Sequence, residues 1–345
     1  MRRFGKFLAA ASLVLALTFC VTFGAGAQDV IKIGAIYPLS GPMALLGNHD
    51  MNGVELATEI MNERGGIGGK KIQLVKADAP TAEAARSEAE RLISVEKLNV
   101  IFGTYSSSLS YVASSVAEKY KKIYWETGAI ADKITQRGFK YVFRNCTQAS
   151  NFGQAAADFA TEKVAKELNI PLKDLRACIM HEDSLYGTSV MGAAEKRLKE
   201  KGVKLLAMES YSKSVTDLSP LVMKFKSLKP DVVLATCYAN DAILWQRQMR
   251  QLNLNLKAMI GSGGGHGVLD FAKATGDDSD GVFSADFPLV KDPKSLDPNL
   301  DPPLKTVFER YKAKYGDLPD LHAMSAFTGA WVFYQHVLAK AGSSD

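Results

Sequence analysis

Apolar residues along this chain form two kinds of run, short continuous ones and longer ones with helical spacing. Residues 31–39 are almost continuously apolar, as expected of a parallel strand that is buried on both faces. After a Ser-Gly-Pro break, Met51, Val54 and Ala57 recur three residues apart, which places them on one face of a helix. The rest of the chain repeats this strand–helix unit.

The unit recurs in two groups. In the first, strands are predicted at 31–39, 72–78, 100–102 and 123–126, with helices between them. A short strand at 141–144 leaves this group, and the pattern restarts with strands at 176–181, 203–209, 231–237 and 258–260. Two amphipathic helices, at 304–315 and 321–339, follow a proline-rich loop at 286–303. Such alternation predicts an α/β fold with two parallel sheets, each covered by helices.

The first 27 residues are predicted to be a signal peptide rather than part of the fold. Three basic residues within the first six positions precede an apolar run at 7–21, and Ala-Gly-Ala at 25–27 offers a cleavage site. The alternative is a lipoprotein signal modified at Cys20, which the bulky Phe19 disfavours. No later run reaches the ~20 apolar residues of a membrane span, so an exported, soluble product is expected.

The remaining chain is close to electrically neutral. Removing three of the 42 Lys and Arg residues leaves 39 against 37 Asp and Glu, a formal net charge of +2. This balance gives no electrostatic footprint for nucleic acid or for an anionic membrane. Of the three remaining cysteines, Cys178 and Cys237 lie in apolar runs and are expected to be buried. The odd count leaves at least one cysteine free or paired between chains.

The segment 99–131 carries the best candidate for a binding site. It is predicted to run from a strand through a turn at 103–108 into a helix, and then through a second strand to a turn at 127–130. In a parallel sheet both turns lie at the carboxyl edge, where α/β proteins bind ligands. The serines at 106–108 would lie at the helix N-terminus, where free N–H groups attract an anion. Alternatively, they only cap the helix.

Other motifs are weaker. The glycine-rich segment 65–70 follows a helix and precedes a strand, the reverse of a phosphate-binding loop, which favours a simple turn. The glycine-rich segment 261–267 does follow a strand, but a rim loop explains it better than a nucleotide site. The five histidines are dispersed and no Cys-x-x-Cys occurs, so neither a metal site nor a cofactor is expected. No Gly-x-Ser-x-Gly elbow supports a serine hydrolase.

Several segments, in order and spacing, resemble one family. They are IKIGAIYPLSGP, NGVELATEIMNERGGIGGKKIQL, the YSSS turn, GAIADKITQRGF and ATCYANDA. Through them the chain resembles the periplasmic substrate-binding proteins of ABC transporters, in the branched-chain amino acid (leucine/isoleucine/valine) binding family, over 31–340. The resemblance implies two doubly wound, Rossmann-like lobes joined by hinge strands, the periplasmic binding protein type I fold.

The resemblance also implies a layout for the chain. Lobe 1 would comprise 28–147 and 286–345, and lobe 2 would comprise 148–285. Family members continue for several tens of residues past this point, so a C-terminal segment of lobe 1 is expected to be missing.

The ligand site implied by the resemblance lies between the lobes. Ser106 and residue 130, with nearby backbone N–H groups, would hold a ligand carboxylate, while Gly128 would offer a carbonyl. Tyr186 and Tyr238 would close over the ligand from lobe 2. The candidate site residues are Leu46, Ser106, Ser107, Glu126, Gly128, Ala129, Ile130, Tyr186, Tyr238, Gly263 and His322.

Four of these residues depart from the family's pattern. Ile130 stands in place of a hydroxyl residue, Gly263 in place of the acidic acceptor of the ligand's ammonium, and Leu46 in place of a large aromatic residue. Losing one partner of a buried charge pair typically costs ~2–5 kcal/mol, so an α-amino acid held in the usual way is expected to bind poorly. Glu126, acidic where the family has a small residue, could replace the acceptor or bind a hydroxyl or amide of another ligand.

We therefore expect a periplasmic receptor that captures an amino acid or a related small carboxylate, including an aromatic one, by hinge closure. It would deliver this ligand to the permease subunits of an ABC importer, act as a monomer and perform no chemistry. One alternative on the same scaffold is a sensor that signals to a partner protein. Another is an enzyme that uses a serine of the cleft.

Overall fold

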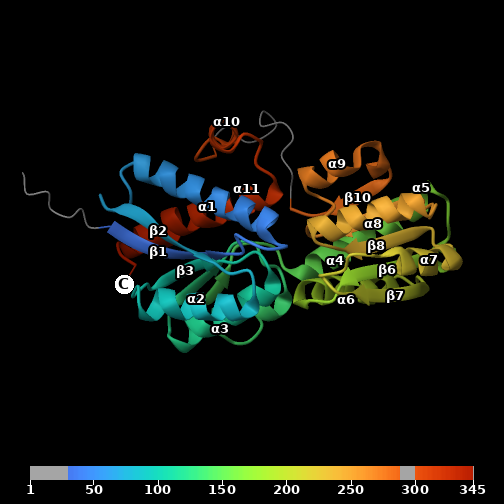
Figure 1. Cartoon of the computed structure of the whole chain (residues 1–345), viewed down its shortest axis with the longest axis horizontal. Helices are drawn as coiled ribbons and strands as arrows, with labels where there is room; N and C mark the ends of the chain where they lie inside the picture. The colour runs from blue at the N-terminus through green and yellow to red at the C-terminus, as the bar shows by residue number, and fades with distance from the viewer. Residues whose placement is uncertain (1–29, 288–299, 345) are drawn as a thin grey trace, which may run out of the picture.

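The computed structural model describes residues 30–287 and 300–344. The predicted signal peptide and most of the proline-rich loop lie outside these residues. The described chain folds into two α/β lobes that lie side by side along the long axis of the molecule (Figure 1). The two-lobed α/β fold predicted from the sequence is confirmed.

Lobe 1 is built on a parallel sheet with the strand order β2-β1-β3-β4-β5. The helices α1 (Ala44–Glu63) and α11 (Leu321–Val332) cover one face, and α2 (Ala82–Ser94) and α3 (Ser107–Lys119) cover the other (Figure 1). All of β3 and most of β1 is buried, which explains why their sequences lack polar alternation. The strands are β1 (Val30–Tyr37), β2 (Lys71–Asp78), β3 (Val100–Gly103), β4 (Ile123–Glu126) and β5 (Val142–Arg144).

Lobe 2 has a second parallel sheet, in the order β10-β9-β8-β6-β7. Its strands are β6 (Ala177–Glu182), β7 (Leu205–Tyr211), β8 (Val232–Thr236), β9 (Ala258–Ser262) and β10 (Val282–Ala285). The helices α4 and α6 pack together on one face, and α8 lies on the other with α7 and α9 beside it (Figure 1). These helices are α4 (Ala149–Phe159), α6 (Leu185–Glu200), α7 (Ser219–Leu228), α8 (Ala239–Gln251) and α9 (Leu269–Thr275).

Two short elements of lobe 2, α9 and β10, were not predicted from the sequence. The segment that holds them is short and interrupted by Gly and Asp, and β10 buries none of its residues fully. The helix predicted at 149–168 is real, but it contains a π-helical turn, Ala160–Val164, between α4 and α5 (Ala165–Glu167).

After lobe 2 the chain returns to lobe 1. It forms α10 (Leu304–Tyr315) and α11, which continues through a π-helical turn, Phe333–Leu338, into α12 (Ala339–Ala341). The backbones of α1 and α11 touch, because a Cβ added at Gly53 would lie 2.1 Å from the carbonyl oxygen of Ala323. Segments that are distant in sequence therefore complete one helical layer.

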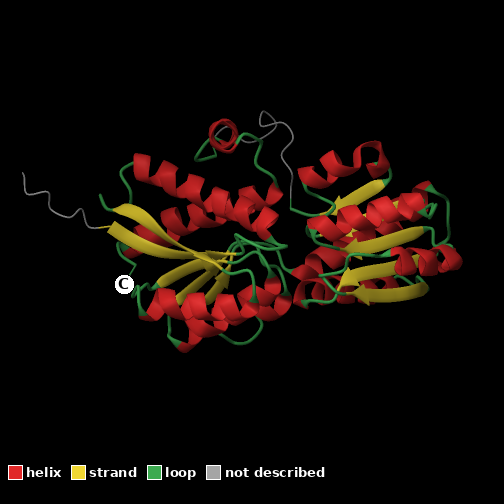
Figure 2. Cartoon of the chain, in the orientation of Figure 1, coloured by secondary structure: helices red, strands yellow, loops and turns green. Residues whose placement is uncertain are grey.

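Each sheet reverses its strand order at one point, between β1 and β3 in lobe 1 and between β6 and β8 in lobe 2. The strands of both sheets point toward the junction of the lobes (Figure 2). Open α/β sheets bind ligands at the carboxyl ends of the strands where the order reverses. The fold thus turns two such edges toward each other.

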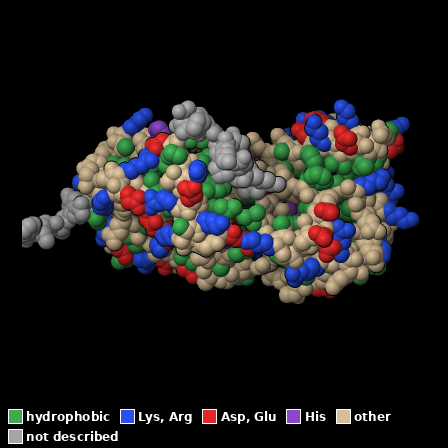
Figure 3. All heavy atoms as spheres, turned by 90° about the horizontal axis from the view of Figure 1, so that it is seen from above, with side chains coloured by type: hydrophobic (Ala, Val, Ile, Leu, Met, Phe, Trp, Pro, Cys, Tyr) green, Lys and Arg blue, Asp and Glu red, His purple; other side chains and the backbone are tan. Residues whose placement is uncertain are grey.

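Charged side chains of both signs are interspersed over both lobes in the view from above (Figure 3). Among the described residues no helix is long and apolar enough to cross a membrane. Cys178 and Cys237 are buried, as predicted, and Cys146 is half-buried; none of the three forms a disulfide within the described chain.

Candidate functional site

The first turn of the site leads from β3 into α3. Ser106 is the N-cap residue of α3, yet its side chain does not cap the helix. Its hydroxyl instead lies 3.3 Å from the hydroxyl of Tyr238 in lobe 2. Tyr105, in a left-handed backbone conformation with φ 111°, packs its ring against the rings of Tyr238 (5.9 Å between centroids) and His322 (5.3 Å). This turn therefore contacts both lobes.

The second turn, which follows β4, is held by the carboxylate of Glu126. This fully buried group accepts hydrogen bonds from the three N–H groups of residues 127–129, at 2.7–3.0 Å, and from the N–H of Thr104 at 2.9 Å. The hydroxyls of Ser110 and Tyr124 also donate to it. Burial raises the pKa of Glu126, and these hydrogen bonds oppose that rise.

Glu126 does not fit either role that the sequence suggested for it. Both carboxylate oxygens are occupied by donors of its own lobe, so none is left for an ammonium, hydroxyl or amide of a ligand. The N–H groups of Gly128 and Ala129, expected near the ligand carboxylate, are engaged by Glu126 as well. The acidic residue fixes the shape of the turn instead.

Lobe 2 presents Tyr186, near the start of α6, and Tyr238, the N-cap residue of α8. The hydroxyl of Tyr186 donates to the carbonyl oxygens of Ser262 (3.0 Å) and Gly263 (2.6 Å), which ties α6 to the loop after β9. The rings of Tyr186 and Tyr238 lie 5.2 Å apart. Lobe 2 therefore contributes two adjacent tyrosine rings to the cleft.

The two edges enclose a small cavity of about 10 Å³, enough for about one water molecule. None of the described residues that line it is acidic, and none is Lys or Arg. The lobes touch at its edge, since a Cβ added at Gly263 (φ 71°) would lie 3.0 Å from Cδ1 of Ile130. The lining residues are Tyr105, Ser107, Gly128, Ile130 and His322 of lobe 1 and Tyr186, Tyr238 and Gly263 of lobe 2.

The structure brings together seven of the eleven residues named from the sequence. Leu46 and Ala129 are buried in lobe 1 and do not line the cavity, and neither does Glu126. Ser106 reaches the cleft only through its contact with Tyr238. Sequence reasoning missed Tyr105, although its place in the turn after a buried strand was a usable signal.

A second missed residue, Asp50 of α1, lies behind the cavity. It is fully buried, and its Oδ1 is 3.8 Å from Nδ1 of His322. Its Oδ2 faces Gly128, where an added Cβ would lie only 2.5 Å away. Burial raises the pKa of Asp50 and lowers the pKa of His322 to about 4. The sequence signal was an acidic residue on the apolar face of a helix, between Leu46 and Val54.

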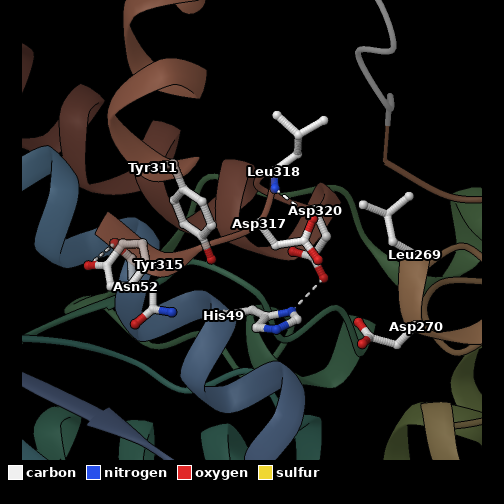
Figure 4. Close-up of a pocket in the computed structure, with 9 residues that line it drawn as sticks. All are labelled: His49, Asn52, Leu269, Asp270, Tyr311, Tyr315, Asp317, Leu318 and Asp320. Atoms are coloured by element: carbon white, nitrogen blue, oxygen red, sulfur yellow. Dashed lines mark hydrogen bonds and ion pairs between the residues drawn. The ribbon is translucent and has the colours of Figure 1, made fainter. Parts of the chain in front are cut away.

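Two further cavities lie along the junction of the lobes. One, of about 90 Å³, is bounded by α1, α9 and the segment between α10 and α11 (Figure 4). There, Nδ1 of His49 lies 2.8 Å from the carboxylate of Asp320. Burial alone would raise the pKa of Asp320, but the hydrogen bond with His49 holds it below its usual value. Beside it, Lys273 of lobe 2 pairs with Asp317 of lobe 1.

The other cavity, of about 150 Å³, adjoins Tyr238. It lies between residues 42–43 of lobe 1 and residues 213–215 of lobe 2. The side-chain amide of Asn240 reaches across it to the carbonyl oxygen of Pro42 at 3.4 Å. In the described part of the chain, no group of three or more His, Cys, Asp or Glu side chains is arranged to hold a metal ion.

A family profile described as periplasmic binding protein matches residues 30–345 of the chain. This chain belongs to that family. The binding protein is 38% identical over 342 residues to Leu/Ile/Val-binding protein homolog 8 of Brucella abortus (strain 2308), covering 99% of this chain and 83% of that protein. The resemblance found in the sequence is thereby confirmed.

Solved structures share the fold of the binding protein. It is similar to the leucine-binding protein LivK of Thermotoga maritima, with a TM-score of 0.79 and 24% identity over 92% of this chain and 85% of that one. It is also similar to a solute-binding protein of an ABC transporter from R. palustris, solved with benzoate, with a TM-score of 0.76 and 21% identity over 91% and 82% of the two chains. The binding protein is a periplasmic solute receptor and not an enzyme.

Proposed function

We propose that this receptor captures a small hydrophobic or aromatic carboxylate that lacks an ammonium group, and presents it to the permease of an ABC importer. The observation that carries the proposal is the lining of the cleft cavity. It combines three tyrosines, a histidine and an isoleucine with the N-terminal end of α3, and it has no acidic side chain among the described residues.

A carboxylate is favoured by the turn that begins α3. The N-terminal N–H groups and the positive end of the helix dipole stabilise an anion at this position. The hydroxyl of Ser106 lies at the same helix end, and within the described chain its one hydrogen-bond partner is the Tyr238 hydroxyl, at a long 3.3 Å. The Ser106 hydroxyl could donate to a ligand carboxylate while its oxygen accepts from the Tyr238 hydroxyl, so neither buried group would be left unpaired.

An apolar or aromatic body is favoured by the rings that surround this point. Tyr105, Tyr186 and Tyr238 have neighbouring ring centroids 5.2–5.9 Å apart, close to the spacing at which aromatic rings contact each other. Ile130 adds an apolar surface where the family's pattern has a hydroxyl. A ligand ring would replace these ring–ring contacts with its own.

An ammonium group would be poorly accommodated. Position 263 is Gly, and the carboxylate of Glu126 is fully engaged by its own lobe. A charge buried without a partner is costly, so an α-amino acid would lose much of the binding energy gained through its carboxylate.

Capture requires hinge motion, because about 10 Å³ is far smaller than any organic acid. The lobes would separate to admit the ligand and close when both lobes contact it, so that the correct ligand stabilises the closed state. The benzoate and leucine named for the two similar proteins represent the two ligand classes to be compared. We propose that the receptor acts as a monomer.

Thermal denaturation followed by calorimetric titration tests the proposal with benzoate and leucine as probes. A ligand that binds only the folded protein raises the melting temperature, and saturation at about 100 times Kd contributes about 2.7 kcal/mol. Benzoate is expected to bind more tightly than leucine. Tight leucine binding with no response to benzoate or other aromatic acids would overturn the preference for a carboxylate without an ammonium group.

A further inference from the structure

We propose that Asp50 and His322 form a pair that shares one proton and uses it to donate a hydrogen bond from His322 to the carboxylate of the ligand. Ligand capture would then require that proton. The inference rests on the proposed function, since it names the group that meets the carboxylate, and it adds a pH dependence that the proposed function does not contain.

The pair stands out because its polar atoms are unsatisfied. Neither oxygen of Asp50 and neither ring nitrogen of His322 has a hydrogen-bond partner in the part of the chain that the structure describes. The two residues are only 0% and 2% exposed. The large majority of buried side-chain polar atoms in proteins are hydrogen-bonded, so four unpaired atoms in one place point to a partner that arrives from outside the fold.

The position of the pair decides which partner that is. His322 lines the cleft cavity, whereas Asp50 does not and lies behind it, with Oδ1 3.8 Å from Nδ1 of the imidazole. When Nδ1–H is directed to Asp50, the remaining nitrogen, Nε2, is left for a ligand. A neutral imidazole with its proton on Nδ1 offers Nε2 as an acceptor, so Nε2 donates only in the imidazolium form, in which both nitrogens carry protons. His322 is the only side chain of the described lining that can carry this positive charge.

The other groups around His322 are aromatic rings or carboxylates that already have hydrogen-bond partners. From its own helix, Asp320 accepts from His49 of α1 and from the N–H of Ala323 at the helix start. From the turn after β3, Tyr105 presents its ring edge-on to the imidazole, and after β10 the ring of Phe287 packs at 6.1 Å. Glu126 is occupied as described above. Asp50 is therefore the carboxylate available to support a charge on His322.

The sign of the pH effect follows from these surroundings. Burial disfavours a charge on either group alone, which raises the pKa of Asp50 and lowers that of His322. Two interacting sites titrate as a pair, so one proton can lie on the carboxyl or on the imidazole without a change in total charge. A ligand carboxylate at Nε2 favours the imidazolium form. Binding should therefore be strongest while the pair keeps its proton and should weaken as the pH rises and that proton is lost.

Calorimetric titration of benzoate between about pH 6 and about pH 9, where the ligand stays ionised, tests the inference. For the unmodified receptor, the affinity is expected to fall toward high pH, by at most tenfold per pH unit for one proton. His322→Phe and Asp50→Asn should each weaken benzoate binding at pH 6 by about ten- to hundredfold, as for a lost hydrogen bond to a charged group. Both variants should also lose the pH dependence.

His336→Phe is the matched control. His336 is exposed on the π-helical turn after α11, outside the cleft, so this variant should retain both the affinity and its pH dependence. His322→Gln is the second test, because it keeps a neutral donor; it should bind better than His322→Phe and show no pH dependence. Circular dichroism of each variant without ligand checks that it is folded.

The outcomes separate the two proposals. If neither benzoate nor other carboxylates bind at any pH, the proposed function fails and this inference fails with it. If benzoate binds but His322→Phe and Asp50→Asn behave like His336→Phe, the inference is overturned while the proposed function stands. A flat pH profile of the unmodified receptor, with weakened His322 variants, would also overturn it, because the histidine would then serve only to shape the cleft.

Discussion

Single buried carboxylates determine which polar groups of the cleft remain available to a ligand. Glu126 at the end of β4 and Glu182 at the end of β6 both accept hydrogen bonds from the turns that follow them. Each lobe therefore contributes a turn whose N–H groups are already satisfied. Recognition is left to side chains and to the N-terminus of α3, since the first N–H groups of α6 are engaged by Ser184 and Glu182.

Ser106 is the residue whose replacement tests the carboxylate site most directly. Ser106→Ala should weaken benzoate binding by about 1–3 kcal/mol, because a buried acceptor loses a donor. Calorimetric titration measures the change. The matched control is Ser108→Ala in the first turn of α3, since Ser108 does not line the cavity and, unlike Ser106, makes no hydrogen bond to Tyr238; this variant should leave the affinity unchanged. Equal affinities for all three proteins would show that the Ser106 hydroxyl plays no part in binding.

At the scale of single residues, the sequence predicted which residues lie at the cleft but not how their side chains are oriented or paired. Residues such as Ser107 and Gly128 could be placed in the cleft, because the strand–turn–helix order alone puts them at the carboxyl edge. The orientation of Glu126 could not be predicted, since it depends on donors from the turn after β3. Asp50 and His322 meet only after the chain has passed through the second lobe, and no local pattern links them.

Among the elements, buried strands were the most predictable and short exposed ones the least. β6, β8 and β9 are buried throughout, so their continuous apolar runs identified them. The short α9 and the partly exposed β10 have no comparable signal. The order of strands in each sheet is a property of the tertiary fold, and it was available from the sequence only through the family resemblance.

Asp241, near the start of α8, links that helix to the end of β7 through a hydrogen bond from the hydroxyl of Tyr211 at 2.6 Å. Burial raises the pKa of Asp241 to about 7. An acid whose pKa is higher in the folded state contributes stability below its unfolded value, about 3.9, and loses it as the pH rises through about 7. The free energy of unfolding should therefore decrease from about pH 5 to about pH 8.

Asp241→Asn should remove this part of the pH dependence, because the amide can still accept from Tyr211 but does not ionise. Urea denaturation at the two pH values measures the effect. Asp277→Asn changes an exposed aspartate of the same lobe and should retain the slope of the unmodified protein. An identical slope in the Asp241 variant would mean that this carboxyl does not titrate differently in the folded and unfolded states.

At the scale of the whole molecule, the main feature is the set of contacts between the two lobes. Besides the aromatic contacts of the cleft, they are joined by the bond from Asn240 to Pro42 and by the ion pair of Lys273 with Asp317. Leu269 and Asp270, at the start of α9, face the α10–α11 connection across the cavity of Figure 4. These contacts link the two lobes, so in the proposed hinge motion they would break before the cleft opens.

The ion pair is expected to contribute little. Its side chains are 57% and 58% exposed, and solvent and salt screen such exposed pairs, so their contribution to stability is small. Lys273→Gln should therefore speed benzoate release about one and a half- to fivefold at low salt, and not at all at about 1 M salt, where the charges are screened. Stopped-flow measurement of release tests this.

Lys305→Gln is the corresponding control, since Lys305 pairs with Glu309 within α10 and does not join the lobes. It should release benzoate at the rate of the unmodified receptor. A larger acceleration in Lys305→Gln than in Lys273→Gln would show that the interlobe pair does not hold the closed state.

The close approach of Gly263 to Ile130 also matters for building sensors from this receptor. With only 3.0 Å between an added Cβ and Cδ1 of Ile130, any side chain at position 263 would act as a wedge between the lobes. Substitutions of increasing size, from Ala to Val to Leu, would hold the lobes apart by increasing amounts. They would thereby change the ligand concentration at which the lobes close. Position 263 is thus a site at which the response range of a fluorescent reporter could be adjusted, at the edge of the cavity next to Ile130 and Tyr186.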